Sequence, residues 1–341
     1  MKVPDTIFNR LLEWGMPANP AVLLIQLGTP DAPTPAALKP YLRQFLGDPR
    51  VIEAPRWRWW FILNFFILPT RPAQSAAKYQ RIWNQQTGSP LLHISRLQAE
   101  ALQRLFTDIP VRFGMQIGNP PVAEVVRQLI DKGVDRLIVL PMYPQYSATT
   151  TASAFDVLFH ALMRERRVPA LRIIPPYYNH PAYIDAVSAV IYDELMKLPA
   201  EPEHYLLSFH GIPVKYVERG DPYPQHVQET TRLLLEKLQW PTGRWTQTFQ
   251  SLFGRDLWLQ PYTDDTLRSL AGKGIKRVFV ATPGFTTDCL ETIDEIGYES
   301  REVFRHAGGE TLQRCPCLND HPAWIRALQT LILEEGKGWL S

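Results

Sequence analysis

The stretch Ala21-Val-Leu-Leu-Ile-Gln-Leu-Gly-Thr-Pro30 decides the fold class of this chain. Six of its first seven residues are apolar, and Gly28-Thr-Pro30 ends the run with turn formers. A short apolar run of this kind is typical of a strand that is covered on both faces. A helix is predicted next, from near Thr34 to a stop at Gly47-Asp-Pro49, so the chain opens with a strand followed by a helix.

The same alternation continues along the chain. Buried strands are predicted at Val111–Ile117 and at Leu137–Leu140, with helical patterns between and after them. Alternating strands and helices predict a parallel sheet with helices on both faces. The predicted fold class is therefore α/β.

The second half of the sequence repeats the first. His204–Pro213 aligns with Ala21–Pro30, and Gly274–Ala281 aligns with Gly133–Leu140. Two weakly similar halves of this kind predict a duplicated α/β domain.

Acidic residues follow a buried strand in the stretch Thr282–Glu299. Asp288, Glu291, Glu295 and Glu299 recur at the spacing that places side chains on one face of a helix. Acids in a first helical turn also have a structural explanation, because Asp288 and Glu291 match a capping box. This stretch alone leaves both interpretations open.

The internal repeat favours a chemical role for two residues. His210 falls where the first half has Leu27, and Glu291 falls where it has Thr150. The shared fold therefore requires neither side chain. Both follow the carboxyl ends of predicted strands, where α/β proteins bind their ligands. A neutral imidazole facing a carboxylate suits a divalent metal or proton transfer near neutral pH.

Composition excludes several classes of protein. The chain has 341 residues, 45% of them hydrophobic, and a net charge of +2 without a basic block, which argues against a nucleic-acid partner. Three cysteines cannot form a paired disulfide framework, and the amino terminus lacks the apolar core of a signal peptide. We therefore expect a reduced, cytoplasmic protein. The glycine-rich motifs of dinucleotide-binding and P-loop proteins are absent from the sequence.

The segment Arg56–Pro69 is unusually aromatic. Its apolar run is far shorter than the roughly 20 residues of a membrane-spanning helix. Three interpretations remain open: a core helix, an interfacial helix that dips into a bilayer, or the wall of a large apolar pocket.

Several motifs, in this order along nearly the whole chain, resemble those of the bacterial ferrochelatases. They are Leu27–Pro30, Leu140–Ser147, Ser208–Pro213, Arg219–Gln225, Trp258–Tyr262 and Pro283–Thr292. The resemblance implies two Rossmann-like domains, each a parallel sheet flanked by helices, with a macrocycle in the cleft between them. The implied domains are residues 1–165, with an aromatic lip at about 56–71, and residues 166–321. The carboxyl-terminal helix 322–341 is expected to join the first domain.

The resemblance also implies an activity, the insertion of Fe(II) into protoporphyrin IX or coproporphyrin III to make haem. His210 would be the active-site histidine and Glu291 its acidic partner, together forming the catalytic and metal-binding pair. Asp288, Glu295 and Glu299 would continue as an acidic row. The implied porphyrin-binding residues are Tyr146, Tyr223, Trp258 and Phe285.

The implied partners are a porphyrin and ferrous iron, with iron as substrate and no required cofactor. Residues 57–68 resemble a pocket lip that meets the membrane in some family members, which would place the protein peripherally on the inner face of the cytoplasmic membrane. The alternatives are a related tetrapyrrole chelatase for another metal and a haem carrier without catalysis.

This chain departs from the family pattern in two places. Many members carry an arginine where this chain has Met115-Gln-Ile-Gly-Asn119. Some members bind a two-iron, two-sulfur cluster through four cysteines, and with three cysteines this chain is expected to bind none. Candidates for binding the porphyrin propionates are Arg43, Arg56 and Arg71.

Overall fold

The computed structural model describes residues 19–254 and 256–340, so the first 18 residues of the predicted first domain lie outside the described residues. The chain forms two four-stranded parallel sheets, which confirms the predicted α/β class. The first sheet has the order β2-β1-β3-β4 and the second β6-β5-β7-β8. Their strands are β1 (Pro20–Thr29), β2 (Val111–Gly118), β3 (Arg136–Pro141), β4 (Ala170–Ile173), β5 (His204–His210), β6 (Trp245–Gln250), β7 (Arg277–Ala281) and β8 (Thr311–Arg314).

The strand registers confirm the internal repeat. Leu23 of β1 lies opposite Val139 of β3, and Leu206 of β5 lies opposite Val280 of β7. In the sequence alignment of the two halves, Leu206 corresponds to Leu23 and Val280 corresponds to Val139. The same topology and the same register therefore occur twice in one chain.

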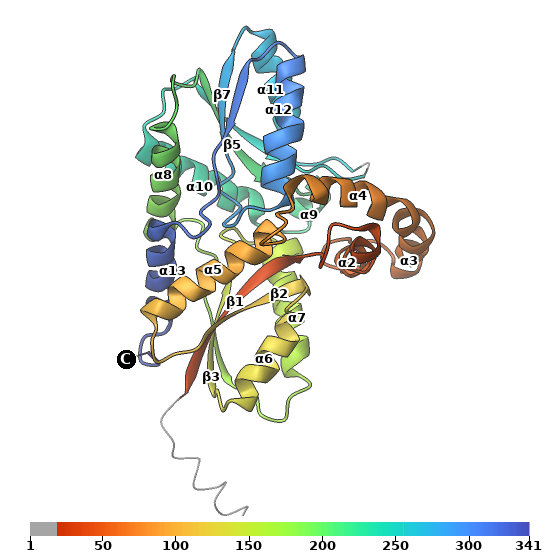
Figure 1. Ribbon diagram of the computed structural model, residues 1–341, viewed down its shortest axis with the longest axis vertical. Helices are drawn as coiled ribbons and strands as arrows, with labels where there is room; N and C mark the ends of the chain where they lie inside the picture. The colour runs from red at the N-terminus through yellow and green to blue at the C-terminus, as the bar shows by residue number, and fades with distance from the viewer. Residues whose placement is uncertain (1–18, 255, 341) are drawn as a thin grey trace, which may run out of the picture.

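Helices cover both sheets, and the two halves lie one above the other along the long axis of the molecule (Figure 1). The helices are α2 (Pro35–Gly47), α3 (Arg56–Ile62), α4 (Leu68–Ile82), α5 (Pro90–Leu105), α6 (Val122–Asp131), α7 (Ser153–Leu162), α8 (Pro181–Leu195), α9 (Val214–Glu218), α10 (Tyr223–Leu238), α11 (Thr263–Gly272), α12 (Arg301–His306) and α13 (Pro322–Glu335). Three segments are π-helices, namely η2 (Leu63–Ile67), η3 (Ala148–Ala152) and η4 (Glu291–Ser300). The Thr34 side chain caps the predicted first helix by accepting a hydrogen bond from the Ala37 N–H at 3.3 Å.

The largest hydrophobic core runs through both halves. It joins Leu24 of β1 to Leu207 of β5 and to the buried Trp324 of α13. Helix α13 contacts α5 and β3 of the first half as well as α8. A shared core fixes the two sheets relative to each other, and the boundary between residues 165 and 166 stays a prediction.

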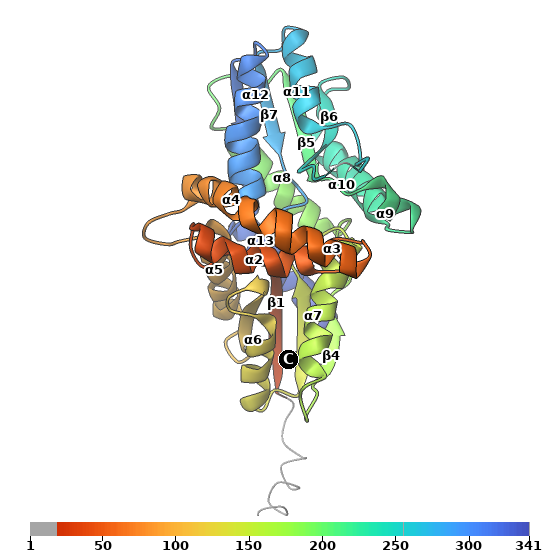
Figure 2. The ribbon, with the colours of Figure 1, turned by 90° about the vertical axis from the view of Figure 1, so that its right-hand side faces the viewer.

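The aromatic segment has a buried side and an exposed side. Trp59, Leu63 and Leu68 are buried together, and the Trp59 Nε1–H donates to the carbonyl of Leu46 at 2.5 Å. The exposed side chains are Trp57, Trp60, Phe61, Ile62, Phe65 and Phe66. Helices α2, α3 and α4 gather on one side of the molecule, near the level where the two halves meet (Figures 1 and 2). Within the described residues, no helix combines the length and the apolar character needed to cross a bilayer.

Candidate active site

His210 is the last residue of β5, and its ring is half-buried. Its Nδ1 lies 2.6 Å from the carbonyl oxygen of Gly211. Because a carbonyl can only accept, Nδ1 carries a proton in this contact. The neutral ring therefore has its free lone pair on Nε2, the atom that can bind a metal or accept a proton.

Two aromatic rings lie near this imidazole. The Trp258 ring centroid is 6.5 Å from that of His210, and the Phe285 centroid is 6.3 Å away. The Trp258 Nε1–H donates to the Phe253 carbonyl at 2.9 Å, which fixes the indole. Gly211 lies close beneath, because a Cβ there would stand 3.2 Å from the Trp258 ring. The structure thus brings together three of the predicted site residues.

Gln250 links His210 to Glu291. It is the residue opposite His210 in the parallel pair of β5 and β6. Its amide Nε2–H donates to the main-chain carbonyl of Glu291 at 2.8 Å, and its Oε1 accepts from the Ser208 hydroxyl at 2.8 Å. This buried amide holds the first residue of η4 beside the end of β5.

Glu291 begins a ten-residue π-helix rather than an α-helix, and Asp288 lies in the loop before it. The i→i+5 hydrogen bonds of a π-helix give a wider turn than those of an α-helix, so residues four apart stay close in angle. Glu291, Glu295 and Glu299 have this spacing. π-helical segments occur frequently at functional sites.

Asp288 stands apart from these acids, and the predicted capping box is also wrong. The Asp288 N–H donates to the Asn319 side chain at 2.9 Å, and the reach-back bond at the helix start runs from the Cys289 N–H to Thr292 at 3.1 Å. The buried Asp288 carboxylate accepts from Arg314 at 2.6 Å. The Asp288 N–H is thus bonded to Asn319, whereas a capping box assigns that N–H to the Glu291 side chain. Arg314 binds the Asp288 carboxylate.

Glu295 is the carboxyl with the clearest perturbation. Burial, together with the charge of nearby Glu291, raises its pKa to about 7, although two hydrogen bonds from Ser251 oppose the shift. The Ser251 N–H and hydroxyl each donate to the carboxyl at 2.6 Å. A carboxyl with this pKa can take up and release a proton near neutral pH.

Glu299 at the outer end of η4 is paired with cations. Its carboxylate lies 2.7 Å from Lys78 and 3.3 Å from Arg81, both on α4. Arg81 also forms two hydrogen bonds to the fully buried Asp294, at 2.5 and 2.7 Å. The acidic row therefore has two parts, with Glu291 and Glu295 at its inner end and a charge-balanced cluster at its outer end.

A small cavity lies beside Glu291, between the two halves. Its polar lining includes the phenols of Tyr41 and Tyr79 and the Cys289 thiol. Burial raises the pKa of each of these three groups, and nearby Glu291 raises it further. They stay protonated at neutral pH, and the Tyr41 hydroxyl donates to the Gly28 carbonyl at 3.4 Å.

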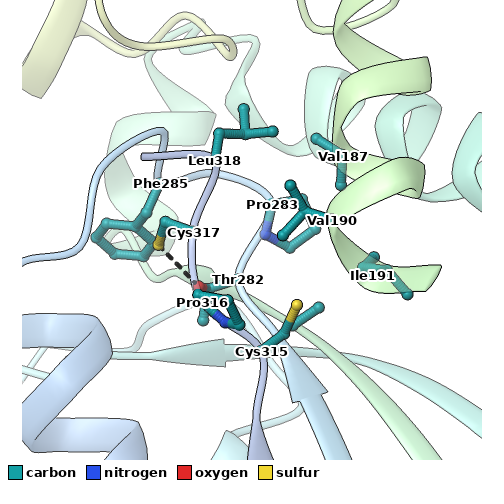
Figure 3. A pocket seen from close by; sticks show the side chains of 11 residues that line it. Val187, Val190, Ile191, Thr282, Pro283, Phe285, Cys315, Pro316, Cys317 and Leu318 are labelled. Atoms are coloured by element: carbon teal, nitrogen blue, oxygen red, sulfur yellow. Dashed lines mark hydrogen bonds between the residues drawn. The ribbon is translucent and has the colours of Figure 1, made fainter. Parts of the chain in front are cut away.

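A second small cavity lies behind Phe285. Figure 3 shows the Phe285 ring beside Cys317 on one side and Val187, Val190 and Ile191 of α8 on the other. The Cys317 thiol is 3.5 Å from the Thr282 hydroxyl. Phe285 therefore lines this cavity, and its ring centroid lies 6.3 Å from that of His210.

The two predicted tyrosines lie in the loop after β3 and at the start of α10. Tyr146 is half-buried in the loop after β3, and its N–H donates to His226 Nδ1 at 3.1 Å. Tyr223 begins α10 and is buried in the main core, with its hydroxyl beneath Gly284. It lies behind the loop that carries Phe285. Their contact with a porphyrin stays a prediction.

Sequence reasoning missed Gln250, Lys78 and Arg81. The strand registers place Gln250 of β6 where the first half has Gln116 of β2, but the sequence analysis predicts no strand at Trp245–Gln250. The two cations are more than 200 residues from their acidic partners along the chain, so no local pattern could reveal the pairing. Among residues 19–254 and 256–340, no three His, Cys, Asp or Glu side chains are grouped so that they could hold a metal ion.

Comparison with known proteins identifies relatives of the chain. A sequence model of the Ferrochelatase family matches residues 19–336. Ferrochelatase of Mesorhizobium japonicum is 48% identical over 94% of this chain and 92% of its own length, and that of Pectobacterium atrosepticum is 47% identical over 91% and 97%.

Solved structures show the same fold. SirB from Bacillus subtilis with Fe3+ aligns with a TM-score of 0.53 at 17% identity, covering 74% of this chain and 94% of its own. The sirohydrochlorin chelatase SirB from Bacillus subtilis subspecies spizizenii, in complex with cobalt, aligns with a TM-score of 0.51 at 13% identity, covering 93% and 95%.

Proposed function

The chain belongs to the ferrochelatase family, and from this premise we propose that His210 and Glu291 together deliver ferrous iron to a porphyrin bound between the two halves. The enzyme is a lyase of haem synthesis that inserts iron into a porphyrin. Two pyrrole protons leave the ring as iron binds its four nitrogens. The site therefore needs groups that hold the metal and groups that remove the protons.

The link through Gln250 carries the proposal for the pair. Gln250 lies opposite His210 in the sheet, and its amide holds the Glu291 main chain, so the first residue of η4 lies next to the strand pair that ends in His210. The His210 Nε2 lone pair is available to iron, and a carboxylate oxygen of Glu291 is a suitable second ligand. Iron held by two protein ligands keeps positions open for the porphyrin nitrogens.

Proton removal is assigned to Glu295. Its pKa of about 7 lets it accept a proton that leaves the porphyrin and release it again at neutral pH. It lies four residues after Glu291 on η4, which supports a path from the pair along the helix. The outer cluster around Glu299 is already balanced by Lys78 and Arg81 and takes no proton in this scheme.

Trp258 and Phe285 are proposed to contact the macrocycle. They flank His210 with two flat apolar rings, a composition that suits the faces of a porphyrin. Protoporphyrin IX carries fewer carboxylates than coproporphyrin III. We assign it as the native substrate because the aromatic lip exposes mostly apolar side chains beside the site. A porphyrin bound more tightly when bent than when flat would take up metal faster.

Anaerobic assays of the purified enzyme test the scheme. With Fe(II) and protoporphyrin IX, the porphyrin absorption bands should convert to those of haem, and kcat/KM should exceed that for coproporphyrin III by about tenfold, roughly 1.4 kcal/mol. His210→Ala and Glu291→Gln should each fold and bind porphyrin but insert iron at least about 100 times more slowly. A Glu291→Gln enzyme that melts at a lower temperature but turns over normally would assign Glu291 a purely structural role.

Iron acts as substrate in this proposal, and no iron–sulfur cluster takes part. Such clusters are bound by four cysteine thiolates in most cases. This chain has three cysteines, and burial raises the pKa of each thiol. Iron and sulfide analysis of the enzyme purified without oxygen should find neither in stoichiometric amount.

Residues 57–68 are proposed to contact a membrane surface. Trp57 is 75% exposed and Phe66 64%, and arginines at 56, 58 and 71 flank the segment. Exposed aromatic side chains beside arginines are typical of interfacial anchors. The enzyme should float with anionic liposomes, and a Trp57→Ser, Phe66→Ser variant should remain at the bottom of the gradient with unchanged kcat on detergent-solubilised porphyrin.

A further inference from the structure

The loop Thr282–Cys289 joins β7 to η4, and it carries Phe285 and leads directly into Glu291. Although the loop belongs to the second half of the chain, its side chains bond to the first half. The Thr286 hydroxyl donates to the Met142 carbonyl at 3.0 Å. The Thr287 Oγ1 accepts from the amide of Gln26 on β1 at 2.9 Å.

Gln98 of α5 is the centre of this contact. Its side chain is fully buried, and its Nε2 donates to Thr287 Oγ1 at 3.0 Å and to the Asn319 carbonyl at 2.7 Å. Asn319 in turn accepts from the Asp288 N–H at 2.9 Å. One glutamine of the first half thus holds the loop directly and through the neighbouring segment.

This network contributes more to geometry than to stability. Buried amides and hydroxyls lose hydration, and apolar side chains of similar volume in the same place are often equally stabilising. A fully bonded buried network, however, fixes a unique arrangement of the groups it joins. Here the joined groups lie between Phe285 and Glu291 on one side and the first-half wall on the other.

We infer that Gln26, Gln98 and Thr287 are positioning residues that fix Phe285 and Glu291 at the required distance from the first half of the chain. The inference rests on the proposed function, in which a porphyrin lies between the halves and Glu291 delivers iron to it. A bound macrocycle contacts both halves, so a shift of the loop changes the distance from Glu291 to the ring. Misplacement by about 1 Å can slow a reaction about 100-fold.

Substitutions at Thr287 provide a matched pair. Thr287→Val keeps the shape and removes the hydroxyl, whereas Thr287→Ser keeps the hydroxyl. We expect Thr287→Val to lower kcat for iron insertion about 10-fold to 100-fold, with the porphyrin KM changed less than about twofold. Thr287→Ser should retain a kcat near that of the unchanged enzyme.

Gln98→Leu is the second variant, and Gln103→Leu on the same helix is its control. Gln103 bonds to the carbonyls of Phe106 and Ile109 and to the Val111 N–H, away from the loop. Gln98→Leu should reproduce the loss of kcat, and Gln103→Leu should lower only the melting temperature.

Normal kcat in Thr287→Val or in Gln98→Leu overturns the inference, and so does an equal loss of kcat in Gln103→Leu. Glu291→Gln, measured in parallel, separates the two proposals. Normal kcat in Glu291→Gln refutes the proposed function itself. An inactive Glu291→Gln enzyme together with a normal Thr287→Val enzyme refutes only the positioning role.

Discussion

In the first half of the chain β1 reaches Leu27 near its carboxyl end, whereas in the second half β5 ends at His210. The neighbouring strand supplies a buried glutamine opposite each, Gln116 in the first half and Gln250 in the second. The amide of Gln116 bonds to side chains within its own half, and that of Gln250 reaches the Glu291 carbonyl. The duplicated fold thus provides the same framework twice, and the second half adds the reactive groups.

The π-helices differ in the same way. In the first half η3 has five residues and contains Thr150, whereas in the second half η4 has ten residues and begins at Glu291. The short π-helix is fixed at its start by Ser147 and by Asp221 of the second half, whose carboxylate accepts from the Ser147 hydroxyl and the Ala148 N–H at 2.8 Å. The long one is tied to α4 through Asp294 and Glu299. The longer π-helix places Glu291, Glu295 and Glu299 four residues apart along one element.

The strongest test restores first-half residues in the second half. His210→Leu should lower kcat at least about 100-fold, since general acid–base or ligand roles have about this magnitude. Its melting temperature should be unchanged, because the equivalent strand folds with leucine. Combined with Glu291→Thr, the loss should be no larger than that of His210→Leu alone, measured as kcat under anaerobic conditions.

If the fold-loss of kcat in this double variant equals the product of the two single-variant losses, the two residues act independently. Leu27→Met is the matched control, because it changes the same position of the fold in the half without the reactive pair. It should retain normal kcat.

Gln250→Leu tests the link between the two groups. Removing the amide releases the Glu291 carbonyl and should lower kcat about tenfold, a smaller effect than loss of either reactive group. The porphyrin KM should change little, because the flanking rings remain in place. Gln247→Leu, on the same strand but three residues before the site, should leave both constants unchanged, and a loss there would assign the effect to the strand.

Sequence alone predicted the two sheets, their repeat and the placement of His210 at the end of a strand. These features depend on apolar runs and turn residues, which are local. The π-helix and the bonds of Asp288 could not be predicted. Both depend on distant groups, such as Arg314 and Asn319 around Asp288 and Lys78 beside Glu299.

Glu295 tests the inner part of the acidic row through pH. Folding raises its pKa from 4.5 to about 7, so the folded state favours the protonated carboxyl. The resulting stabilisation is complete below pH 4.5 and is lost as pH rises through 7, and it amounts to roughly 3 kcal/mol. Urea unfolding should show this loss between pH 4.5 and 8 in the unchanged enzyme, and Glu295→Gln should not show it. If the free energy of unfolding of Glu295→Gln falls with pH as steeply as that of the unchanged enzyme, other groups cause the pH dependence.

Glu299→Gln should have the smallest effect, and it separates the outer end of the row from the inner end. Glu299 and its partners Lys78 and Arg81 are about 40% exposed, and such pairs contribute about 0 to 1 kcal/mol. Because these cations already balance its charge, the carboxylate has no free capacity for iron or for a proton. We therefore expect unchanged kcat and iron KM in anaerobic assays of iron insertion, and a slightly lower melting temperature. An iron KM that rises several-fold would instead extend the metal path along the whole of η4, and the acidic row would then act as a single unit.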